Sequence, residues 1–119
     1  MLSSKEHFDL IRIKEKSNGD LVFLGDIYAE FLLEIPKKMH SIKMFLKENK
    51  KDEILKICHS LIGILPLFGM ESSLTIILKI KSQLQQNGID NAIQKQFEEL
   101  DFILKSVLIE MEMEISKLS

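Results

Sequence analysis

One stretch of the sequence holds a histidine in a setting that suits covalent chemistry. The run from Lys56 to Gly69 contains His59, with Gly63 four residues after it. If the run is helical, residues four apart lie one above the other, so Gly63 leaves open space one turn from the imidazole. A neutral imidazole is a nucleophile and can accept an electrophilic group such as phosphoryl. The spacing therefore predicts a helical histidine that another molecule can reach.

The apolar residues of the same stretch predict which way this histidine faces. Read as a helix, they fall on one narrow stripe, made of Ile54, Cys58, Leu61, Leu65 and Phe68. Such a stripe is the face that a helix buries. At about 100° per residue, His59 lies roughly 140° from the centre of the stripe. We therefore expect His59, Gly63 and Pro66 on the outer side, and Cys58 in the core.

The stretch resembles the signature of the histidine-containing phosphotransfer (HPt) domain family. That signature reads His-x-Leu-Lys-Gly, then a small or polar stretch, an apolar residue and Gly. Five positions match it: His59, Leu61, Gly63, Phe68 and Gly69. Ile62 stands where the family has lysine, and Ile64 stands near a family serine. The resemblance implies that His59 accepts phosphate from an aspartate of one receiver domain and passes it to another, in a two-component phosphorelay.

The resemblance also implies what the partner must supply. A flat helical face has no oxyanion hole, paired general base or metal site with which to catalyse the transfer. In the family, the partner is a response-regulator receiver domain or a hybrid histidine kinase, and the receiver brings the catalytic groups and Mg²⁺. We therefore expect a phosphocarrier that is not an independent enzyme and that binds no cofactor or metal of its own.

Ile62 gives no charge to a phosphate, so other side chains must compensate. Lys56 precedes His59 by one turn and points to the same side. Lys81 lies on the next predicted helix, near where the family often has a polar residue that contacts the histidine ring. Gln85, one turn further, could hydrogen-bond the ring. Lys81 could instead simply cover apolar surface with its long stem.

Apolar side chains near the histidine face predict a docking patch for a protein. They are Leu55, Ile62 and Pro66. Apolar groups around an exposed polar residue are typical of protein interfaces. Leu55 and Ile62 could in part pack against the adjacent helices.

Two other functions stay open, the first of them because of the missing lysine. One is a degenerate HPt-like adaptor that docks a receiver or a kinase without carrying phosphate. The other is a helical bundle that pairs with another chain through the apolar patch and has no role in signalling.

The rest of the sequence predicts the helices that position His59. Ser3 and Glu6 have the spacing of a capping box, which starts a short helix to about Lys16. An apolar stripe from Asp20 to about Asn49 keeps its phase across Pro36, so we expect one long kinked helix, with two abutting helices as the alternative.

Three more helices follow, each with its own boundary signals. Asp52 is the expected N-cap of the His59 helix, which ends near Leu67, and Gly69 suits a left-handed residue after it. A helix from Met70 to about Gln86 carries an apolar arc of Leu74, Ile77, Leu78 and Leu84. Asn87-Gly88 ends this helix, and Asp90 caps a last one that runs to about Lys117.

Composition limits the classes of protein. The chain has 119 residues, 45% of them hydrophobic, and only two prolines and five glycines, which favours one all-α domain over residues 1–119. The expected architecture is an antiparallel up-and-down four-helix bundle with the extra short N-terminal helix as a lid.

Charge and cysteine usage predict the surroundings of the protein. The net charge of −2 gives no basic field for nucleic acid. No apolar run approaches the ~20 residues that span a bilayer, and the first residues lack a signal-peptide pattern. A single cysteine fits a reducing compartment. We expect a cytoplasmic monomer with no membrane association.

Overall fold

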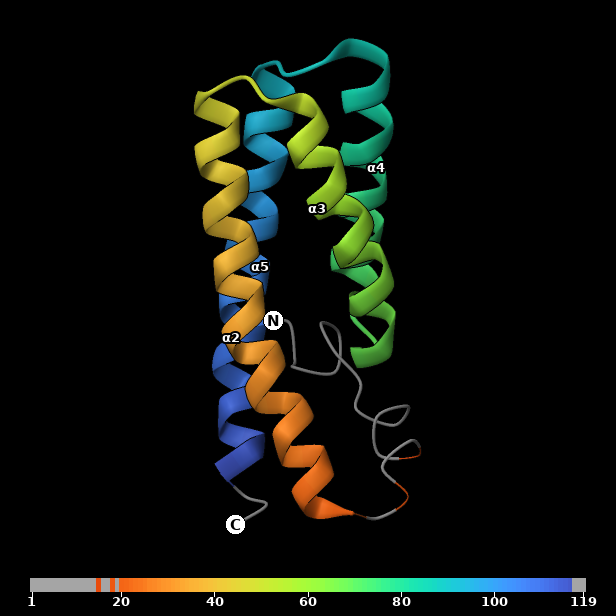
Figure 1. The fold of residues 1–119 in the computed structure, drawn as a ribbon, viewed down its shortest axis with the longest axis vertical. Helices are drawn as coiled ribbons and strands as arrows, with labels where there is room; N and C mark the ends of the chain where they lie inside the picture. Colours follow the sequence, from red (N-terminus) through yellow and green to blue (C-terminus); the bar gives the residue numbers. More distant parts are fainter. Residues whose placement is uncertain (1–14, 16–17, 19, 117–119) are drawn as a thin grey trace.

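The computed structural model describes residues 15, 18 and 20–116 as a set of four long helices (Figure 1). The helices are α2 (Leu21–Lys47), α3 (Lys51–Ile64), α4 (Glu71–Asn87) and α5 (Asn91–Ser116), with a short 3₁₀ helix, η2 (Leu65–Phe68), between α3 and α4. No strand occurs among these residues, so the all-helical prediction is confirmed for them. The predicted short N-terminal helix lies, apart from Glu15, outside the described residues.

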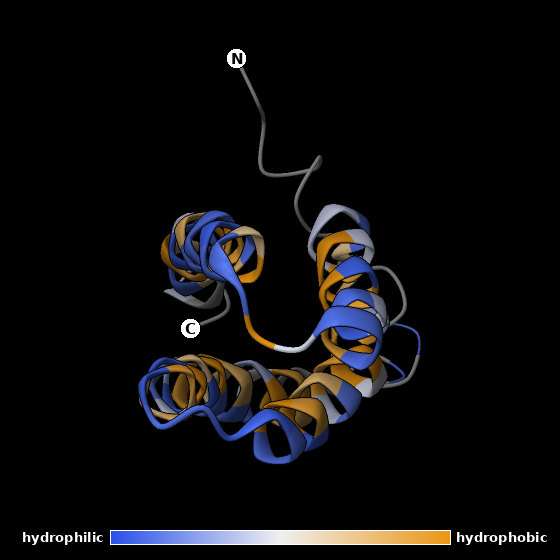
Figure 2. Cartoon of the chain, turned by 90° about the horizontal axis from the view of Figure 1, so that it is seen from above, coloured by the Kyte–Doolittle hydropathy of each residue, from blue (hydrophilic) through white to orange (hydrophobic). Residues whose placement is uncertain are grey.

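The four helices form a closed ring of neighbours. Each helix packs on the next one in the chain, and α2 also packs on α5, so α3 and α5 lie at opposite corners. Successive helices run toward alternate ends of the molecule in Figure 1. Seen from above, apolar segments gather mainly on the sides of the helices that face one another (Figure 2). None of the helices described here is both long and apolar enough to cross a membrane.

The core draws its side chains from all four helices. On α2 the buried stripe continues from Ile35 to Met39 without a change of phase, although Pro36 lies between them. Pro36 has no amide hydrogen, so one hydrogen bond of the helix is absent. Because Pro36 is exposed, this bond is absent on the solvent-facing side of the helix. The prediction of one long helix through Pro36 is therefore confirmed.

Three predicted helix boundaries are also confirmed. The backbone amide of Ile93 donates to the Asp90 carboxylate at 2.9 Å, which caps α5. Gly69 ends η2 in the left-handed conformation, with φ of 64°. Gly88 follows α4 with φ of 74°, again a region that favours glycine.

The prediction that Asp52 caps α3 is wrong. The helix begins at Lys51, and Lys50 occupies the cap position without a side-chain hydrogen bond. Asn49 adopts a left-handed φ of 56°, and the amide of Lys50 donates back to the carbonyl of Phe45 at 2.9 Å. The chain thus reverses so tightly that α3 starts before Asp52. Its carboxylate lies in the first turn, where it interacts favourably with the helix dipole.

One residue of the predicted apolar arc on α4 is also placed differently. Leu78 is 47% exposed, whereas Ile80, which the arc did not include, is fully buried. Leu78 follows the buried Ile77 directly and therefore lies about 100° around the helix from it. The buried stripe of α4 instead follows the spacing Ser73, Ile77, Ile80 and Leu84.

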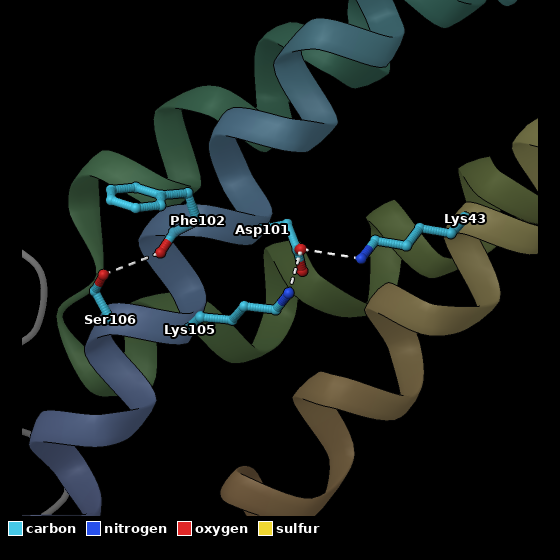
Figure 3. Close-up of polar contacts among 5 residues, drawn as sticks. All are labelled: Lys43, Asp101, Phe102, Lys105 and Ser106. Carbon is cyan, nitrogen blue, oxygen red and sulfur yellow. Dashed lines mark hydrogen bonds and ion pairs between the residues drawn. The ribbon is translucent and has the colours of Figure 1, made fainter.

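A cluster of charges ties α2 to α5. The carboxylate of Asp101 on α5 lies 3.0 Å from the ammonium of Lys43 on α2 and 3.0 Å from that of Lys105 on α5 (Figure 3). Burial raises the pKa of Asp101, but the hydrogen bonds and charges of Lys105 and Lys43 outweigh it. The net pKa is lower than the ordinary value of an aspartate.

We expect Asp101→Asn to destabilise the protein in a way that depends on pH. Because the folded-state pKa lies below the unfolded-state value, the carboxylate stabilises the fold above about pH 4 and loses this effect as pH falls through the folded-state pKa. The free energy of unfolding of the variant should be roughly 1 kcal/mol lower than that of the parent at pH 7. Urea unfolding followed by circular dichroism should show a smaller difference at pH 3.

The matched control is Asp26→Asn, which changes an exposed carboxylate on α2. It should leave the free energy of unfolding nearly unchanged at both pH values. An Asp101→Asn protein as stable as the parent at pH 7, or equally weakened at pH 3, would contradict the role given to this cluster.

Candidate functional site

The rotation of α3 is set by its buried stripe. Ile54, Cys58 and Leu61 of α3 are fully buried, and the stripe continues through η2 with Leu65 and Phe68, as predicted. The exposed residues of α3 lie on the opposite side: Asp52, Lys56, His59 and Gly63. They recur every three or four residues and so share one face. The packing of α3 therefore turns His59 outward.

The ring of His59 is free to meet a partner. His59 is exposed, and its ring makes no hydrogen bond or ion pair with any residue in the described part of the chain. A fixed internal hydrogen bond would commit one ring nitrogen. Within the described residues, both nitrogens are open to a reaction partner.

Gly63 leaves open space beside the histidine. A Cβ atom built at this position meets nothing within 4 Å outside its own helix turn. Its φ is not in the left-handed region, so the backbone does not require glycine here either. The lack of a side chain at Gly63 is thus not explained by packing within the described residues.

The two lysines proposed near the site differ in availability. The ammonium of Lys56 lies 3.3 Å from the carboxylate of Glu53 on the preceding turn. Because the lysine side chain is 74% exposed, this ion pair is weak and can open. Lys81 is half-buried on α4, and its charge acts on the Cys58 thiol, so it lies on the side of α4 that faces α3. Neither lysine forms a hydrogen bond or an ion pair with His59.

Gln85 lies one turn beyond Lys81 on α4. It is exposed, and no hydrogen bond joins its amide to His59. Since residues four apart share a helix face, Gln85 lies on the same side of α4 as Lys81. The predicted contact with the imidazole would therefore have to form when a partner binds.

Cys58, which precedes His59 in the sequence, has an unreactive thiol. Burial raises the pKa of its thiol to about 12, and the charge of Lys81 offsets this only in part. The thiol therefore stays protonated at neutral pH, and the prediction that Cys58 belongs to the core is confirmed. The accessible nucleophile of α3 is the imidazole.

Three apolar side chains of α3 and η2 lie beside the exposed face of α3. Leu55 and Ile62 are half-buried and pack in part against the core, as the alternative interpretation expected, and Pro66 is half-buried in η2. Sequence reasoning missed Leu78, which is three residues from Lys81 and therefore lies on the same side of α4. We call Leu55, Ile62, Pro66 and Leu78 the apolar rim. The sequence pattern predicts Leu78 in the buried arc of α4 and therefore not in the docking patch.

The arrangement offers a nucleophile, open space and an apolar rim, but few catalytic groups. The described residues contain no group of three or more His, Cys, Asp or Glu side chains that could hold a metal ion. A groove of about 430 Å³ lies between α2 and α5, and His59 does not line it. The face around His59 therefore suits contact with another protein better than enclosure of a small molecule.

The open space at Gly63 leads to a prediction about stability. We expect Gly63→Ala to raise the free energy of unfolding by roughly 0.5–1 kcal/mol, because alanine favours the helix and its methyl group meets no neighbour. Gly25 on α2 is a matched control, since a Cβ there also meets nothing within 4 Å. Gly25→Ala should stabilise by a similar amount in the same urea titration. A loss of stability in Gly63→Ala alone would mean that the space is not open.

The comparisons with known proteins leave the family open. No protein-family model matches the chain, and neither a curated protein nor a solved structure is significantly similar to it. Any function must therefore be argued from the residues of α3 and their surroundings.

Proposed function

We propose that the protein carries phosphate in a multistep phosphorelay, with His59 as the phosphoacceptor. The observation that carries this proposal is an exposed imidazole on a helix whose opposite face is buried, one turn from the open space at Gly63. The likeness of residues 59–69 to the HPt signature supports it. The proposed partners are a response-regulator receiver domain, a hybrid histidine kinase, or both.

The reaction would be a transfer between an acyl phosphate and a phosphoramidate. A ring nitrogen of His59 attacks the phosphorus of a receiver's phosphoaspartate, the N–P bond forms, and the bond from phosphorus to the aspartate oxygen breaks. The aspartate leaves as a carboxylate, and the imidazole releases its proton. The second receiver reverses these steps. The receiver supplies Mg²⁺ and the groups that stabilise charge on the transferring phosphoryl.

The apolar rim would hold the receiver in place during transfer. Leu55, Ile62, Pro66 and Leu78 offer contact area, while Lys56 and Lys81 bring positive charge toward the phosphoryl group. Lys56 would leave Glu53 to do so, at the small cost of an exposed ion pair. Gln85 would approach the ring in the complex.

We further propose that the protein is cytoplasmic and that its helices form an up-and-down bundle. In this arrangement α3 runs antiparallel to α2 and α4. A single buried cysteine supports a reducing compartment.

A degenerate adaptor is the second candidate function, and one observation favours it. Ile62, at the position of the family's lysine, packs in part against the core and offers the phosphate no charge. The cation nearest in sequence, Lys56, is paired with Glu53. Such a face could dock a receiver through the apolar rim without accepting phosphate.

We expect His59→Gln to abolish labelling by a phosphorylated receiver. The purified protein is mixed with the phosphorylated receiver and Mg²⁺, and acid-labile, base-stable phosphate is measured on the chain. The matched control is His40→Gln, which removes an exposed histidine of α2 and should label like the parent. Equal labelling of the His59→Gln protein would refute phosphotransfer through this residue. A parent chain that binds the receiver but never labels would favour the adaptor.

Ile62→Lys tests the departure from the family signature. A lysine here would place a cation one turn from His59, so we expect labelling to become several-fold faster, with a modest loss of stability from the removed apolar side chain. Single-turnover transfer measured by quenched flow gives the rate. Ile62→Met keeps the apolar character and serves as the control. If both variants transfer at the parental rate, charge at this position does not limit the reaction.

A further inference from the structure

The outer face of α5 carries a stripe of large apolar side chains. Phe102 is 74% exposed, Ile109 is 61% exposed and Met113 is 60% exposed. With Ser106 between them, these residues recur at spacings of four, three and four, which is the repeat of a two-helix seam. The buried residues of α5, such as Leu104 and Val107, lie on the opposite face. Within the described part of the chain, the stripe has no partner.

The polar groups within this stripe are satisfied by the helix itself. The hydroxyl of Ser106 donates to the carbonyl of Phe102 at 3.1 Å, and that of Ser116 donates to the carbonyl of Met113 at 2.6 Å. Figure 3 shows Phe102 and Ser106 on the side of α5 turned away from Lys43. A surface that covered this face would therefore leave neither hydroxyl without a partner, and the small Ser106 would let it come close.

We propose that this face binds the same face of a second copy of the chain, with the two α5 helices antiparallel. Symmetry lets one stripe serve both sides of the interface. Phe102 of one copy then lies against Met113 of the other, a favourable contact of a thioether with an aromatic ring. Ser106 lies against Ile109 of the other copy, so a small side chain meets a large one at the centre.

Charge complementarity supports the same arrangement. Lys105 and Glu112 are exposed and flank the stripe on the same side. Antiparallel pairing brings Lys105 of each copy near Glu112 of the other, twice by symmetry. Lys105 would share its ammonium between that Glu112 and Asp101 of its own chain, which lies 3.0 Å away. Parallel pairing would set Lys105 against Glu110, one of whose carboxylate oxygens is buried in its own chain. It would also set Ser106 against Ser106 and leave a gap.

The interface would be weak and independent of phosphotransfer. Contact between two helices alone buries less than the area of a standard interface, which is about 800 Å² per partner. The protein should therefore be a monomer at low concentration and form dimers as its concentration rises. Because α3 lies at the corner opposite α5, pairing leaves His59 open. The dimer can therefore exist whether or not His59 carries phosphate.

Sedimentation equilibrium of the full chain from micromolar to millimolar concentration tests the pairing. The parent should approach twice the monomer mass of 13.8 kDa. Ile109→Glu places a charge in the seam and should weaken association about tenfold or more. The matched control is Leu33→Glu, which alters a 59% exposed leucine on α2 and should associate like the parent. A parent that stays monomeric, or equal effects of the two variants, would overturn the proposal.

Disulfide trapping tests the orientation. Phe102→Cys and Met113→Cys proteins, mixed and oxidised mildly, should give a covalent dimer that neither variant forms alone. In the antiparallel pair, two copies of position 102 lie about 16 Å apart along the helix, too far for a disulfide. Cys58 does not interfere, because it is buried and burial raises its pKa to about 12. Efficient linkage of Phe102→Cys with itself, or no linkage in the mixture, would overturn the antiparallel arrangement.

Discussion

The burial of one face of α3 is the constraint on which the site depends. Ile54, Cys58 and Leu61 are fully removed from solvent, and burial of an isoleucine or leucine side chain contributes roughly 1.5–3 kcal/mol. A rotation that brought His59 inward would expose several of them, and no single interaction of an imidazole could offset that loss. The exposure of His59 is thus imposed by the core and not by contacts of the ring itself.

The packing of the described residues does not require a histidine at position 59 or a glycine at position 63. His59 has no internal partner among the described residues, and Gly63 fills no tight space. A glycine within a helix costs about 1 kcal/mol relative to alanine, yet nothing in the described packing requires it. Packing among the described residues therefore does not account for the identity of either residue, whereas the proposed phosphotransfer would use both.

Much of this arrangement could be predicted because buried stripes depend only on local spacing. The continuous stripe across Pro36 predicted one helix, and the stripe containing Cys58 predicted the direction of His59. The start of α3 could not be predicted, because it depends on the left-handed Asn49 and a backbone hydrogen bond from Lys50. Spacing allows the pairing of Lys56 with Glu53, three residues away, but the rotamers of the two side chains decide whether it forms. The burial of Ile80 in place of Leu78 depends on which side of α4 its neighbouring helices cover.

The central claim is that the imidazole of His59 is open in the native protein. Carbethoxylation by diethyl pyrocarbonate, followed over time by mass spectrometry of each histidine, tests this most directly and needs no partner. We expect His59 to react at a rate similar to that of His40, which is also exposed. A His59 that reacts only after unfolding, while His40 reacts in the native protein, would contradict the account.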